Sequence, residues 1–211
     1  MIIYFIITLA IISRFVPHVP NFAPITAIAI FSAAHLSWKK SFAITLAARF
    51  FSDIFLGFFA WPLMVAVYAS HLFGVILGLW IKRNKTVIPK ATKRSEGLSG
   101  IYNFGSRIKS GMTEKKWIKI ILSPLITSVV FFLATNFAFL YANYPHNISG
   151  IIQSYANGLP FFRGTLFGDL TYTLALFGGY ALAMKIQTSL LRQGFGGQVK
   201  SKIQISSVGN D

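Results

Sequence analysis

The stretch PITAIAIFSAAHLSWKKSFAITLAARFFSDIFLGFF, residues 24–59, contains two apolar runs separated by a short gap that carries Lys39 and Lys40. Each run approaches the length of a helix that crosses a hydrocarbon core of about 30 Å, at about 1.5 Å of rise per residue. The second run carries Arg49 and Asp53 within its apolar sequence. Ionisable side chains inside such a span are costly and indicate a functional site.

The same apolar pattern continues on both sides of this stretch. Further runs occur at residues 2–15, 62–81, 117–141 and 165–184. With 54% hydrophobic and 12% charged residues, a water-soluble fold would lack polar surface. The sequence therefore predicts an all-α integral membrane protein, with residues 1–185 forming a single domain that is a six-transmembrane-helix bundle. Residues 186–211 are polar and rich in glycine, and we expect them to form a disordered cytoplasmic tail.

The net charge of +15 would suggest nucleic-acid binding if it were spread over a soluble surface. Instead, eleven of the twenty Lys and Arg residues lie between Lys82 and Lys119. Basic loops remain on the cytoplasmic side of a membrane. A cytoplasmic loop at 82–116 leaves only Arg14 and Arg163 among the loop cations outside. We therefore predict a multi-pass protein of the inner (plasma) membrane, with both termini cytoplasmic, contacts to the lipid bilayer and no nucleic-acid partner.

The candidate binding residues lie at one level of this predicted bundle. Asp53 and Asp169 are within spans, and the topology places both in the outer half of the membrane. Side chains from other segments are expected at this level or just above it: Asn136, Tyr68, Arg14, His18, Asn21 and Arg163. The segment RFVPHVPNFAP, residues 14–24, has three prolines that restrict its backbone, as in a preorganised wall. These eight residues predict a site for a small-molecule substrate.

Structural interpretations of the same residues remain open. Arg49 and Asp53 are four residues apart on one helix, a spacing that allows a purely structural ion pair. Asp169 can pair with Arg163 or form hydrogen bonds across the bundle, and Asn136 can join helices. The chain has no cysteine, which excludes disulfides and thiolate metal sites, and we predict no metal and no cofactor.

Two features within the apolar runs predict packing. Ala29 and Ala33 form a small-xxx-small pair of the kind that lets transmembrane helices approach closely. His71 lies near the middle of its run, and we interpret it as a packed histidine bonded to a backbone carbonyl.

The segments RFVPHVPNFAPITAIAIF, FFSDIFLGF, TNFAFLY and YANGLPFFRGTLFGDLTYTLALFGG together resemble a group of bacterial six-helix membrane proteins assigned to transport. That group is similar to the S components of energy-coupling factor (ECF) transporters, and the resemblance covers about residues 1–185. It implies an S-component-like bundle that binds a vitamin-like molecule from outside and works with a membrane subunit and ATPases supplied by other chains. The first run, IIYFIITLAIISRF, lacks the Ala-rich motif typical of S components.

The predicted function is therefore a membrane-embedded substrate-binding component of a transporter, without enzymatic activity. One alternative is an intramembrane enzyme that acts on a lipid or prenyl substrate through Asp53 and Asp169, because two carboxylates can share a proton and activate water. Another is a structural membrane subunit whose polar residues only pair with one another.

Overall fold

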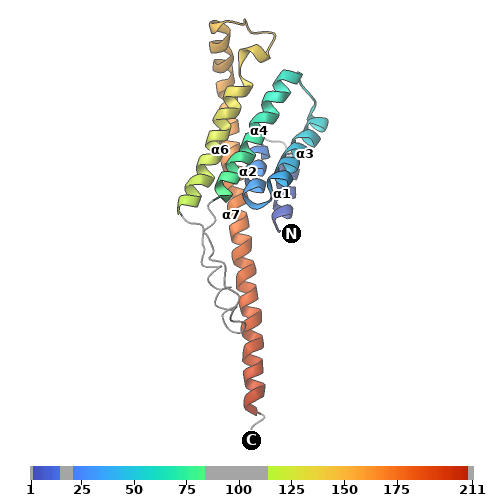
Figure 1. Ribbon diagram of the computed structural model, residues 1–211, viewed down its shortest axis with the longest axis vertical. Helices are drawn as coiled ribbons and strands as arrows, with labels where there is room; N and C mark the ends of the chain where they lie inside the picture. Colours follow the sequence, from blue (N-terminus) through green and yellow to red (C-terminus); the bar gives the residue numbers. More distant parts are fainter. Residues whose placement is uncertain (1, 15–20, 84–113, 209–211) are drawn as a thin grey trace.

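The computed structural model describes residues 2–14, 21–83 and 114–208, and the regular elements of these segments are all helical. The described α-helices, in order, are α1 (Ile2–Ser13), α2 (Ile25–His35), α3 (Trp38–Leu56), α4 (Trp61–Lys82), α6 (Glu114–Thr135) and α7 (Ile148–Val208). A short 3-10 helix, η1 (Ala138–Leu140), precedes α7. The helices lie side by side in a bundle, and α7 projects beyond it (Figure 1). The predicted all-α fold with six helices is thus confirmed.

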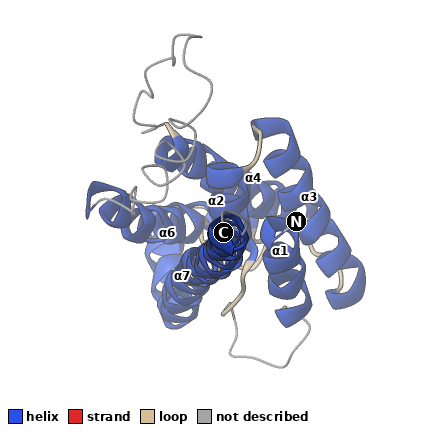
Figure 2. Ribbon diagram, turned by 90° about the horizontal axis from the view of Figure 1, so that it is seen from below, coloured by secondary structure: helices blue, strands red, loops and turns tan. Residues whose placement is uncertain are grey.

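The shortest of the described α-helices, α2, forms the centre of the bundle. Nine of its residues are buried, from Ile25 through Ala33. It contacts α1, α3, α4, α6 and α7, and Figure 2 shows it among these helices. A helix that is apolar or small on every side is stable only where every side is covered. The composition of ITAIAIFSAAH therefore accounts for its central place.

The backbones of α2 and α4 approach closely through small residues. A Cβ atom added at Gly74 would lie 3.2 Å from the Cβ atom of Ala29. One added at Gly78 would lie 2.6 Å from the Cβ atom of Ala33 and would collide with the carbonyl of Ile30. The packing predicted for the alanine pair is confirmed, and its partner is a pair of glycines spaced by four residues.

Two helices, α4 and α6, are long and apolar enough to cross a membrane, and α1 and α2 are shorter apolar helices. This result agrees with the membrane class that the composition predicts. Basic side chains mark the end of the bundle where α2 and α4 finish. There Lys82 donates a hydrogen bond to the carbonyl of Leu36, and the ammonium of Lys119 lies 4.2 Å from the centroid of the Trp80 ring.

The last helix begins earlier than the sequence predicts. The apolar run suggests a start at residue 165, but α7 begins at Ile148. Gly158 and Pro160 are typical of a loop, yet both lie inside the helix. The glycine is needed for packing on α6, because a Cβ atom there would collide with the side chain of Asn136. Gly158, although glycine is common in turns, therefore lies inside a helix and allows a close contact with Asn136.

The end of the chain also differs from expectation. The polar segment 186–211 predicts a disordered tail, whereas α7 remains helical to Val208 and extends past the other helices (Figure 1). Adding a residue to an existing helix is much easier than starting one, so packing of the first half of α7 favours its continuation.

Candidate functional site: a polar cavity at one end of the bundle

Two adjoining cavities lie at the end of the bundle opposite Lys82. The larger has a volume of about 510 Å³ and the smaller about 270 Å³. Both are lined by Arg14, Asn21, Arg49, Phe131 and Thr165. These residues come from the end of α1, the start of α2, and helices α3, α6 and α7, so the folded bundle brings together segments that are far apart in the sequence.

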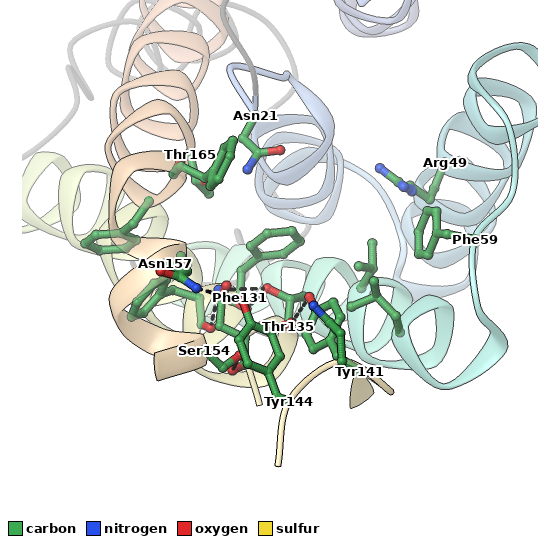
Figure 3. Close-up of a pocket in the computed structure, with 18 of the residues that line it drawn as sticks. Asn21, Arg49, Phe59, Phe131, Thr135, Tyr141, Tyr144, Ser154, Asn157 and Thr165 are labelled. Atoms are coloured by element: carbon green, nitrogen blue, oxygen red, sulfur yellow. Dashed lines mark hydrogen bonds between the residues drawn. The ribbon is translucent and has the colours of Figure 1, made fainter. Parts of the chain in front are cut away.

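The larger cavity has a wall of aromatic rings and amides. The rings of Phe59, Phe131 and Tyr144 border it, and Asn21 and Asn157 contribute amide groups. In Figure 3 these side chains surround a central space from several elements. Asn157 donates a hydrogen bond of 3.0 Å to the hydroxyl of Tyr144, which fixes one side of the rim. Such a wall offers flat apolar faces together with polar edges.

Hydrogen bonds at the end of α6 support this wall. The last carbonyls of an α-helix have no partner within the helix. Tyr141 donates to the carbonyl of Thr135 at 2.6 Å, and Ser154 donates to that of Asn136 at 2.6 Å. The amide of Asn136 also donates to the carbonyl of Phe132 at 2.9 Å. Asn136 therefore lines the larger cavity and also joins α6 to α7.

Arg49 is held by a buried carboxylate. Asp53 is 1% exposed, and its Oδ1 atom lies 2.9 Å from Nη2 of Arg49. The Oδ2 atom accepts hydrogen bonds from Nε of Arg49 at 3.0 Å and from the hydroxyl of Tyr68 at 2.9 Å. The guanidinium also lies 5.6 Å from the ring centroid of Phe59. Asp53 and Tyr68 line neither cavity, and they act by positioning Arg49, which lines both.

Arg14 and Asn21 are placed at the junction of the two cavities. Nε of Arg14 donates a hydrogen bond to the hydroxyl of Ser52 on α3. Asn21 has a positive φ of 61°, and asparagine tolerates this left-handed conformation better than most residues. The resulting turn sets the chain on its path into α2. Both predicted residues thus lie where a bound molecule would contact them.

Asp169 lines the smaller cavity. It is 3% exposed, and the hydroxyl of Ser128 donates to its Oδ2 atom at 2.7 Å. The hydroxyl of Thr26 provides a second hydrogen bond. His71 lines the same cavity, and its Nδ1 atom donates to the carbonyl of Val67 at 2.7 Å, which confirms its interpretation as a packed histidine. Asp169 is thus surrounded by neutral hydroxyl groups from two helices.

Of the two remaining predicted residues, one lies away from the cavities and the other is outside the described residues. Arg163 is exposed on α7 and lines neither cavity. Of the two alternatives for Asp169, the salt bridge with Arg163 is not formed, and the hydrogen bond across the bundle is. Thr165, only two residues after Arg163, is buried and lines both cavities. Residues two apart on an α-helix point to different sides, because each residue turns by about 100°. His18 lies outside the described residues.

Comparison with known proteins places the chain in a family. Residues 1–191 match the description "Family of unknown function (DUF6580)". The chain belongs to this family. No curated protein and no solved structure matches it. The membership agrees with the resemblance to a group of uncharacterised membrane proteins, whereas the likeness to ECF S components remains a prediction.

The sequence of this DUF6580 chain does not single out the hydroxyl groups that hydrogen-bond Asp169. Ser128 and Thr26 escape notice because single hydroxyl residues are common in apolar helices. A usable signal exists on α6, where Ser123, Thr127 and Ser128 recur at helical spacing and are all fully buried. Within the described segments, no group of three or more His, Cys, Asp or Glu side chains could hold a metal ion.

Proposed function

We propose that this DUF6580 chain is a membrane-embedded substrate-binding component of a transporter, which captures a small vitamin-like molecule from outside. The observation that carries the proposal is the larger cavity, whose 510 Å³ falls within the range of about 300–1,000 Å³ typical of small-molecule sites. Its lining combines aromatic rings with a few charged and amide groups, the usual composition of such sites.

The two ends of α2 support the proposed orientation. Asn21, before its start, lines the cavities, whereas Leu36, after its end, accepts the hydrogen bond of Lys82. Since basic ends remain in the cytoplasm, the cavity opens toward the outside. In this proposal all six helices lie in the inner (plasma) membrane and both termini are cytoplasmic.

The energy for uptake comes, in this proposal, from other chains. The sequence has no P-loop, so a partner membrane subunit and ATPases drive release of the captured molecule. The alternative of an intramembrane aspartyl enzyme requires two carboxylates that share a proton. Asp53 is bound by Arg49 and Asp169 by Ser128, so the described contacts favour binding over this chemistry.

The proposal is tested by filling the cavity. Thr165 lines both cavities, and Thr165→Trp should occupy the space of the bound molecule. Thr171→Trp is the matched control, because Thr171 is exposed on the same helix. Native mass spectrometry of protein purified in mild detergent should detect a small molecule in the wild type and in Thr171→Trp, but not in Thr165→Trp.

Melting curves of both variants show whether either has lost its fold. Retention of the molecule by a folded Thr165→Trp variant would place binding elsewhere. A wild-type protein that retains nothing, and that the small-molecule extract of the expression host does not stabilise against heat, would contradict the proposed function itself.

A further inference from the structure

The cavity contains a positive charge that no described carboxylate neutralises. The charge of Arg49 is matched by Asp53, through contacts of 2.9 and 3.0 Å. Arg14 also lines both cavities, but its hydrogen-bond partner is the neutral hydroxyl of Ser52. Within residues 2–14, 21–83 and 114–208, the Arg49–Asp53 pair is the one salt bridge. Within these residues the guanidinium of Arg14 therefore lines both cavities without a salt-bridge partner.

The other acids of the described segments form no salt bridge with Arg14. Of the chain's five acidic residues, Glu96 and Asp211 lie outside the described segments. Glu114 begins α6, at the basic end of the bundle. Asp169 lines the smaller cavity together with Arg14, yet it forms no salt bridge with it and takes its hydrogen bonds from hydroxyl groups. As far as the described segments go, a ligand thus meets Arg14 without a salt-bridge partner.

An unpaired guanidinium in a partly enclosed cavity is best satisfied by an anion. The interaction between opposite charges strengthens as water is excluded, and an unmatched buried charge is unfavourable. The planar guanidinium fits the two oxygens of a carboxylate or phosphate. Rings such as Phe59 and Phe131 in the adjoining wall provide faces for a flat ring.

We propose that the captured molecule is a small organic anion with a ring, whose carboxylate or phosphate binds Arg14 and whose ring packs on the aromatic wall. This inference rests on the proposed function and specifies the substrate class of the same site. Asp53 and Ser52 act as positioning residues, because the first holds Arg49 and the second holds Arg14.

The test uses the small-molecule extract of the expression host, divided by anion exchange into an acidic fraction and a non-acidic flow-through. Full-length protein in mild detergent, washed free of retained molecules, is melted in the presence of each fraction. The acidic fraction should raise the melting temperature of the wild type. The affinity for its active component should fall roughly ten- to a hundredfold in Arg14→Gln and less in Arg14→Lys, which keeps the charge.

Arg163→Gln is the matched control, because Arg163 is exposed and lines neither cavity, and it should respond like the wild type. An undiminished response of Arg14→Gln would overturn the proposal. Stabilisation by the flow-through alone would reject the anion and keep the proposed function, whereas no stabilisation by either fraction would reject both.

Discussion

The Asp53 carboxylate shows how a buried acid can serve a site without lining it. Both of its oxygens are engaged, by Arg49 and by the Tyr68 hydroxyl. A bidentate arginine–carboxylate pair fixes the guanidinium in one plane. The sequence leaves a structural pair and a site residue as alternatives for Asp53. The contacts indicate a third arrangement, in which the pair sets the position of a cavity side chain.

This arrangement predicts the effect of breaking the pair. Asp53→Asn leaves Arg49 as a second uncompensated buried charge, and we expect it to lower the free energy of unfolding by about 3–5 kcal/mol. Replacing both partners by apolar residues, in Arg49→Met/Asp53→Leu, should recover most of this loss because no charge then remains unpaired. Tyr68→Phe, which removes one hydrogen bond, should cost about 0.5–1.5 kcal/mol.

Unfolding in mixed micelles measures these differences. A single Asp53→Asn variant that is as stable as the wild type would mean that Arg49 finds another partner. A double variant that is less stable than Asp53→Asn would show that the pair contributes net stability.

At the level of elements, the contact between α2 and α4 depends on glycine. A methyl group at Gly78 would collide with the carbonyl of Ile30, so Gly78→Ala must push the two helices apart. We expect it to lower stability by about 1–3 kcal/mol, the usual effect of overpacking. Gly179→Ala is the matched control on α7, where an added Cβ would meet nothing within 4 Å. It should be neutral or stabilise by up to about 1 kcal/mol, because alanine favours the helix.

Melting temperatures of the two variants in the same detergent give the comparison. Equal melting temperatures of Gly78→Ala and Gly179→Ala would indicate that α2 and α4 can move apart without a loss of stability. Because α2 contacts every other α-helix described, such an opening would also disturb the cavities.

At the level of the whole molecule, the proposed orientation predicts which end of the helix bundle is accessible from outside the cell. The chain has no cysteine, so single cysteines can be introduced without a background. Ala142 is exposed between η1 and α7, at the cavity end, and Arg83 is exposed directly after α4, at the basic end. A membrane-impermeant maleimide should label Ala142→Cys in intact cells and Arg83→Cys only after lysis. The reverse labelling pattern would invert the topology, and labelling of both in intact cells would contradict a cytoplasmic basic end.

The sequence by itself determined the six α-helices of the described segments and the end of the bundle at which the polar groups lie. Apolar run length and charge placement are properties of the chain alone, and the expected runs at 24–38 and 62–81 agree closely with α2 and α4. Position along a helix axis follows from counting, at about 1.5 Å per residue. This is why Arg14 and Asn21 could be assigned to the same level as Asp169.

Only the tertiary structure decided which of these groups share a cavity. The position of a residue along its helix axis does not give the direction in which its side chain points. That direction depends on how each helix is rotated about its axis relative to its neighbours. On α7, Thr165 and Asp169 are four residues apart and share the inner face, whereas Arg163 points away from the cavities. The same contacts explain a glycine inside the first half of α7, because a Cβ atom at Gly158 would collide with the side chain of Asn136.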